Sequence, residues 1–134
     1  MINNKKAGFT LVEFLMAVLL FSISIASLLG VYTQAITVSK RADYAYVAYT
    51  LAKNHIERLR VSDFSTLSDA NETDTPLNRD GDPDLNGEYL RSTTVTPNYV
   101  GDPNLTRVDV SVFYELKKVK SPQSMDMTTV IFNG

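Results

Sequence analysis

The stretch GFTLVEFLMAVLLF, residues 8–21, opens a long apolar run that decides the fold of this chain. Glu13 is the one charge near the start of this run, and no residue from Phe14 to Ser39 is charged. A helix needs about 20 apolar residues to cross a hydrocarbon core of about 30 Å. The run therefore predicts a transmembrane helix with an acid just inside its N-terminal edge.

Basic residues flank the apolar run on both sides. Lys5 and Lys6 precede it, and Lys40 and Arg41 follow it. The positive charge is nearly equal on the two sides, so it favours a cytoplasmic N-terminus only weakly. A secretory signal peptide has a shorter apolar core of about 7–15 residues with its cleavage site behind that core, which SIASLLG at 24–30 could imitate. The alternative is cleavage in front of the run.

The N-terminal residues carry a resemblance to a known family. A short basic leader ending at Gly8, followed by FTLVEFLMAVLLF at residues 9–21, resembles the class III signal of type IV pilins and type II secretion pseudopilins. This resemblance implies that a prepilin peptidase cuts between Gly8 and Phe9, removes the leader 1–8, and methylates the new amine of Phe9. It also implies that Glu13 is the acid used in assembly.

Glu13 needs a partner at membrane depth, because a carboxylate there costs about 2.5–3.5 kcal/mol on insertion scales. Cleavage would supply that partner, since the freed amine of Phe9 is cationic near neutral pH and lies one helical turn before Glu13. In the family that the sequence resembles, neighbouring subunits form this pair. The sequence leaves open whether the pair closes within one chain or between two. It also leaves open whether Glu13 merely complements the helix dipole and reaches the interface.

The helical pattern continues past the apolar run to about Arg60, and the first proline in the chain is Pro76. We expect a membrane-spanning or filament-core half at 9–39 and an amphipathic extracytoplasmic half at 40–60, whose apolar face is covered by the rest of the chain. Gly30 allows either a softer hinge or close helix packing. The residues expected on one face recur at three- and four-residue steps: Ala35, Val38, Ala42, Ala45, Tyr46, Tyr49, Ala52, Ile56 and Leu59.

Residues 61–134 are expected to form a loop region followed by a small antiparallel sheet. Ser, Thr, Asp, Asn, Gly and Pro dominate to about Asn86, which indicates loop. The predicted class is α+β, with a type IV pilin-like fold in which a long N-terminal helix packs on three or four strands. Three segments have the pattern of strands, with KKVKSPQ at 117–123 as a charged turn before the last: EYLRSTTVT at 88–96, RVDVSVFYEL at 107–116 and SMDMTTVIF at 124–132.

The segment NRDGDPDLNGEY, residues 78–89, has the character of a metal site. Residues 82–87 match the opening of a calcium-binding loop. The twelfth position counted from Asp82 is Thr93 in place of a bidentate glutamate, and Pro83 constrains the backbone. The sequence therefore leaves two alternatives, a calcium site and a solvated acidic turn. The candidate oxygen donors are Asp80, Asp82, Asp84 and Asn86.

Composition favours neither catalysis nor nucleic-acid binding. Among the 134 residues, 13 are Lys or Arg and 15 are Asp or Glu, so there is no general attraction to nucleic acid. The absence of cysteine excludes disulfides and a cysteine nucleophile, and one histidine does not assemble a catalytic set. His55 lies beside Lys53 and Glu57 in the polar register of the helix, so we expect a surface or interface position.

The resemblance implies a structural subunit, not an enzyme. In outline the cysteine-free chain is most similar to minor pilins and minor pseudopilins, which are implied to act in initiation, at the tip or in surface presentation. We expect an inner-membrane protein with a cytoplasmic N-terminus and a periplasmic C-terminal domain, later drawn into a pilus or pseudopilus. Expected partners are prepilin peptidase, other pilin or pseudopilin subunits, the inner-membrane assembly platform and, before assembly, lipid. The alternative is a monomeric signal-anchored protein whose extracytoplasmic domain binds a ligand or calcium.

Overall fold

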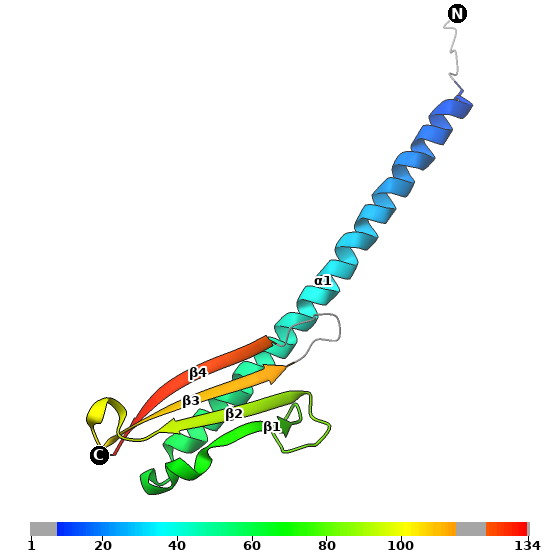
Figure 1. Cartoon of the computed structure of the whole chain (residues 1–134). Coiled ribbons are helices and arrows are strands. Elements are labelled where there is room, and N and C mark those ends of the chain that lie inside the picture. The colour runs from blue at the N-terminus through cyan, green and yellow to red at the C-terminus, as the bar shows by residue number, and fades with distance from the viewer. Residues whose placement is uncertain (1–7, 115–122, 134) are drawn as a thin grey trace, which may run out of the picture. The chain divides into compact units, whose positions relative to one another are not determined.

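The computed structural model describes residues 8–114 and 123–133. The chain divides into two units, one ending at Lys40 and one beginning at Arg41. A long N-terminal helix is followed by a four-stranded antiparallel sheet (Figure 1), which confirms the predicted α+β class. The elements are α1 (Leu11–Arg60), η1 (Phe64–Ala70), β1 (Glu72–Leu77), β2 (Tyr89–Thr96), η2 (Tyr99–Gly101), β3 (Leu105–Tyr114) and β4 (Gln123–Phe132).

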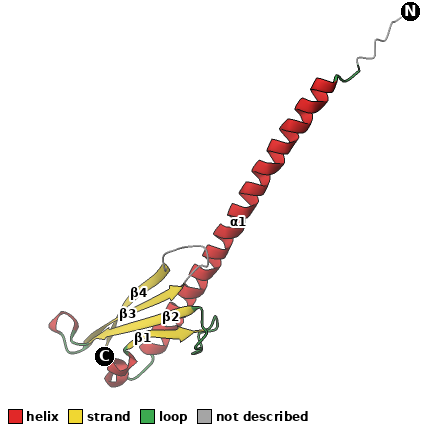
Figure 2. Ribbon diagram, turned by 45° about the vertical axis from the view of Figure 1, so that its right-hand side comes forward, coloured by secondary structure: helices red, strands yellow, loops and turns green. Residues whose placement is uncertain are grey.

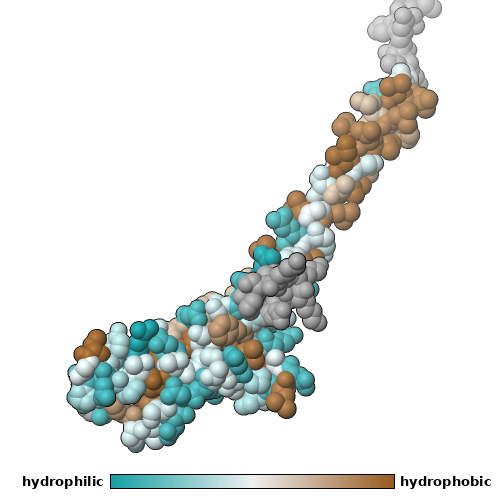
Figure 3. Space-filling model, viewed as in Figure 1, coloured by the Kyte–Doolittle hydropathy of each residue, from teal (hydrophilic) through white to brown (hydrophobic). Residues whose placement is uncertain are grey.

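The first unit contains the N-terminal part of α1, whose side chains are exposed from Leu11 to Ile36. An 18-residue window of α1 has a mean hydropathy of 2.5 and is not buried, so by length and composition the helix is able to cross a membrane. Figure 3 shows apolar surface along this part of the chain. The predicted transmembrane segment is therefore present as a helix with an uncovered apolar surface.

The second unit buries the C-terminal turns of α1 against one face of the sheet (Figure 2). Ala48 and Ala52 are fully buried, and their small side chains allow the sheet to approach the helix closely. The buried residues of the helix are Val47, Ala48, Leu51, Ala52, Ile56 and Leu59. From the sheet come Leu77, Tyr89, Val95, Val108, Val110, Val112 and Tyr114.

The predicted apolar face of the helix was partly wrong. Ala42, Tyr46 and Tyr49 are exposed, whereas Val47 and Leu51, which were not placed on that face, are in the core. Apolar and aromatic residues occur on several sides of this part of α1, so three- and four-residue steps fit more than one stripe. The position of the sheet selects the stripe that is buried.

The sheet has the strand order β1-β2-β3-β4, and all neighbours are antiparallel. The predicted strands at 88–96 and 124–132 correspond closely to β2 and β4. β3 begins at Leu105, and its burial alternates along the strand as its sequence predicts. The end of the predicted strand 107–116, residues 115–116, and the predicted charged turn up to Pro122 lie outside the described residues.

The predicted loop from 61 to 86 was wrong over residues 64–77, which contain η1 and β1. The Asp63 side chain accepts a hydrogen bond from Ser65 N at 3.0 Å and caps η1, which places Leu67 in the core. β1 is an edge strand with a polar sequence that includes Pro76. The polar sequence of β1 therefore does not predict a strand. Antiparallel pairing with β2 stabilises the strand instead.

Candidate functional site

The predicted cleavage junction lies just in front of α1. Gly8 and Phe9 are exposed and have no regular secondary structure, and Phe9 is 77% exposed. An exposed peptide bond outside a helix can enter a protease site without unfolding the helix first. The remaining leader residues 1–7 lie outside the described residues.

Thr10 caps the start of α1 directly behind this junction. Its Oγ1 accepts a hydrogen bond from Glu13 N at 3.2 Å, and its carbonyl accepts one from Phe14 N at 3.1 Å. These bonds make Thr10 the N-cap and place Glu13 at the third helical position, which is the spacing of a capping box. The sequence interpretation missed the role of Thr10, although the Thr-x-x-Glu signal was present.

Glu13 lies in the first turn of α1, where the partial positive charge of the helix N-terminus favours an acid. No hydrogen bond or ion pair joins its carboxylate to any of the residues that the structure describes. The carboxylate is thus available to an external cation. This geometry fits both pairing with an amine and simple complementation of the helix dipole.

Five hydroxyl groups farther along the apolar part of α1 are satisfied within the helix. Their Oγ atoms donate to backbone carbonyls three or four residues earlier at 2.8–3.0 Å. Such bonds remove the need for a partner in lipid. The residues concerned are Ser22, Ser24, Ser27, Thr33 and Thr37. Glu13 therefore remains the one charged group between Leu11 and Ser39.

The predicted calcium donors lie in the loop between β1 and β2, which is organised by its own side chains. Asn78 Oδ1 accepts hydrogen bonds from the backbone N–H groups of Asp80 and Asp82, and Asp84 Oδ1 accepts one from Asn86 N. Across residues 8–114 and 123–133, no three His, Cys, Asp or Glu side chains are grouped as metal ligands. Calcium binding at this loop stays a prediction.

A partly buried polar cluster, made of His55, Glu72, Arg91 and Thr93, lies between α1 and the first two strands. Arg91 Nε and Nη2 both donate to the Glu72 carboxylate, and Thr93 Oγ1 donates to Glu72 Oε1 at 2.8 Å. Burial acts to raise the pKa of Glu72, but the bonds from Arg91 and Thr93 outweigh it, so that the pKa is lowered. The acid therefore stays ionised inside the domain.

His55 is a correction to the expected surface position, since its side chain is only 12% exposed. Its Nε2 lies 3.4 Å from Glu72 Oε1 without forming a hydrogen bond. Burial, followed by the positive charge of Arg91, lowers the pKa of His55 to about 4. The residue is a neutral part of the packing between α1 and β1.

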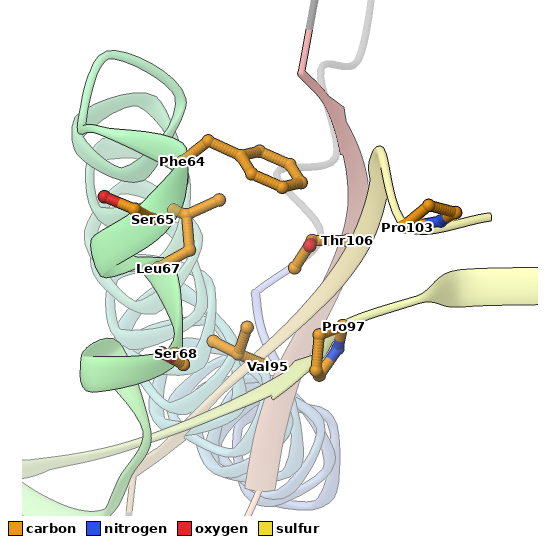
Figure 4. A pocket seen from close by; sticks show the side chains of 8 residues that line it. All are labelled: Phe64, Ser65, Leu67, Ser68, Val95, Pro97, Pro103 and Thr106. Atoms are coloured by element: carbon orange, nitrogen blue, oxygen red, sulfur yellow. The ribbon is translucent and has the colours of Figure 1, made fainter. Parts of the chain in front are cut away.

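A shallow pocket of about 210 Å³ lies where η1 meets the ends of β2 and β3 (Figure 4). Its walls are apolar side chains and hydroxyl groups, and none of the lining residues is an acid, a base or a cation. The pocket thus offers no proton donor or acceptor of the kind that general acid–base catalysis uses. The lining residues are Phe64, Ser65, Leu67, Ser68, Val95, Pro97, Pro103 and Thr106.

Comparison with known families identifies the N-terminal segment. Residues 3–29 match the family model of the prokaryotic N-terminal methylation motif, the class III signal of type IV pilins. No curated protein and no solved structure is significantly similar to the chain. The matched segment contains Gly8, Phe9 and Glu13, and the signal implies processing by a prepilin peptidase and assembly with other pilin subunits.

Proposed function

We propose that this chain is the precursor of a minor pilin or minor pseudopilin, which assembles through α1 into a type IV pilus or a type II secretion pseudopilus. The observation that carries the proposal is the methylation motif at residues 3–29 in front of an exposed apolar helix. Within the filament the subunit acts in initiation, at the tip or in surface presentation. It is a substrate of the peptidase and not itself an enzyme.

The helix start supports a role in processing followed by assembly. Cleavage between Gly8 and Phe9 would leave a mature chain whose second residue, Thr10, already caps α1. The new amine of Phe9 and the carboxylate of Glu13 then belong to the same helix end. A neighbouring subunit whose amine meets this carboxylate would remove an unpaired charge from the membrane, which favours docking in one axial register.

The exposed apolar part of α1 is suited to two successive surroundings, first lipid and then other helices. Before assembly its side chains contact lipid of the inner membrane, with the N-terminus in the cytoplasm and residues 41–134 in the periplasm. During assembly the inner-membrane platform transfers the helix from lipid to a filament core, where other helices replace the lipid. The hydroxyls that bond within the helix need no other partner during this transfer.

Intact-mass analysis of the chain from cells with and without an active prepilin peptidase tests the proposal. With the peptidase, we expect the mature chain to begin at N-methylated Phe9; without it, we expect residues 1–8 to be retained. Retention of the leader in cells with the active peptidase would reject the proposal. It would favour a monomeric signal-anchored protein whose outer domain binds a ligand.

A further inference from the structure

The loop between β1 and β2 presents one apolar side chain to solvent. Leu85 is 94% exposed, and no other large apolar side chain among residues 8–114 and 123–133 is as exposed. The turn that carries it is ordered by hydrogen bonds. Gly87 N donates to the Asp84 carbonyl at 2.8 Å, Asp84 N donates to the Pro76 carbonyl at 3.0 Å, and Asn86 N donates to Asp84 Oδ1 at 2.9 Å. A leucine on an ordered turn loses little conformational freedom on binding, which suits an anchor.

The shallow pocket beside η1 has room for one such side chain. Its volume is about 210 Å³, whereas pockets that bind small molecules hold about 300–1,000 Å³. Figure 4 shows Phe64, Leu67 and Val95 around the hollow, and none of the residues that line it is charged. The size and the apolar wall therefore fit an aliphatic side chain better than a small-molecule ligand.

The loop and the pocket lie at opposite ends of the second unit. The loop joins β1 to β2, whereas Pro97 and Pro103 of the pocket belong to the connection between β2 and β3. Figure 1 shows these two connections at opposite ends of the sheet. Arg79 of the loop donates to Asp43 at the start of the covered part of α1, whereas η1 follows the end of α1 at Arg60. A copy displaced along α1 therefore brings its loop to the pocket of the next copy without reversing α1.

We propose that Leu85 of one copy of this chain inserts into the pocket of a second copy, in a head-to-tail contact between subunits of a filament. Such a contact is heterologous, so each linked pair keeps one free loop and one free pocket, and the contact can repeat along the filament. The inference rests on the proposed function. Two copies side by side in a membrane lie at the same depth, and only assembly displaces one of them along the helix axis.

The small area of this contact argues for a second copy over a free partner. One leucine and its pocket bury far less than the roughly 1,000 Å² that a specific interface between separate proteins needs. A free protein would therefore dissociate quickly. Copies whose α1 helices already pack together hold the loop near the pocket at a high effective concentration, so that one anchoring side chain is enough.

Acidic residues flank both sides of the contact. Asp84 precedes Leu85 in the loop, and Asp102 precedes Pro103 at the pocket. Like charges repel, and salt screens this repulsion beyond about 10 Å at 0.1 M ionic strength. The apolar side chain therefore supplies the attraction, and the contact should not weaken when salt is added.

Cross-linking of introduced thiols tests the contact, because the chain has no cysteine. In full-length chain, Asn86→Cys marks the loop and Ser68→Cys marks the pocket wall, and both positions are exposed. The two variants are produced together, and sheared filaments are treated with a short bifunctional maleimide. The matched control replaces Ser68→Cys with Ser124→Cys, an exposed serine at the start of β4. We expect about tenfold more linked dimer from the first mixture, because only the contact holds its two thiols together.

The side chain at position 85 separates an anchor from simple proximity of the thiols. In the Asn86→Cys chain, Leu85→Met keeps a large apolar side chain, whereas Leu85→Ser removes it. We expect Leu85→Met to retain the linking and Leu85→Ser to reduce it about tenfold. Because Leu85 is exposed in the single chain, neither substitution should change the unfolding of the domain. A chain that carries both Ser68→Cys and Asn86→Cys should give a ladder of linked copies, because the contact repeats.

Equal linking by the target and control pairs in sheared filaments would overturn the inference. Equal linking by the methionine and serine variants would also overturn it, and so would weaker linking at high salt. The proposed function would survive each of these results, because the chain would still be processed and present in filaments. Absence of the chain from sheared filaments would instead reject both the proposed function and the contact.

Discussion

The two halves of α1 belong to one helix but differ in what surrounds their apolar side chains. From Leu11 to Ile36 every side chain is exposed, whereas Val47 to Leu59 includes six buried residues that pack on the sheet. A helical, apolar sequence is common to both. The difference shows that the chain covers only the second half itself, so that the apolar surface of the first half is available to lipid or other subunits.

Two glutamates repeat this contrast. Glu72 is surrounded by protein and receives hydrogen bonds from Arg91 and Thr93. The Glu13 carboxylate receives none from the part of the chain that the structure describes. The domain therefore satisfies its own partly buried acid, whereas the acid at the helix start has no partner among the described residues.

The largest expected effect comes from a glycine substitution in the loop before β2. In Gly87→Ala the new Cβ would lie 2.1 Å from the backbone oxygen of Leu77, so the loop and β1 must move. We expect a loss of about 3 kcal/mol or more in the free energy of unfolding. The measurement is urea unfolding of the full chain in detergent, followed by the circular dichroism signal of the β-sheet.

Gly30→Ala is the matched control, because a Cβ at Gly30 meets nothing within 4 Å. Alanine favours a helix by about 1 kcal/mol over glycine, so the helix should not weaken and unfolding of the domain should not change. If the two variants lower the unfolding midpoint equally, the contrast between a packed and an uncovered region is wrong.

A smaller effect is expected from pH acting on His55. Its pKa is about 4 in the folded chain and ordinarily 6.5, so between these values the unfolded chain binds a proton that the folded chain does not. The free energy of unfolding should be unaffected above about pH 6.5 and fall by on the order of 2 kcal/mol as the pH drops to 4. Arg91 and Arg58 support the neutral ring, and Glu72 opposes it.

Urea unfolding of the unmodified chain and of His55→Gln at several pH values measures how much His55 contributes to the pH dependence of the free energy of unfolding. The variant does not titrate, so its pH dependence between 6.5 and about 4.5 should be flatter. Protonation of Glu72, whose folded pKa is lowered, removes further stability only at more acidic pH in both chains. Identical profiles for the two proteins would show that His55 is not buried as described.

The smallest effect in free energy is expected from Glu13→Val. It should leave cleavage, membrane insertion and domain unfolding intact, because Glu13 has no packing role in the second unit. If the carboxylate pairs with a neighbour's amine, loss of about 1.4 kcal/mol would reduce incorporation about tenfold. The amount in sheared filaments relative to membranes measures this, and normal incorporation would remove the pairing argument.

Much of this organisation was predictable from local sequence. Apolar runs and the periodicity of apolar residues predict the end of the helix near Arg60 and the strands at 88–96 and 124–132. They also predict the alternation of Val108, Val110 and Val112. β1 and the buried position of His55 were not predicted. Both depend on residues distant in sequence, since β1 pairs with β2 and His55 lies beside Glu72.

The sequence by itself determined the motif from Gly8 to Glu13, the uncovered apolar helix behind it and the α+β class, because these depend on the order and hydropathy of adjacent residues. Only the tertiary structure decided which stripe of α1 is buried and which acid is paired inside the domain. Those outcomes depend on the register of strands and on contacts between distant segments. Local patterns limit such contacts but do not select among them.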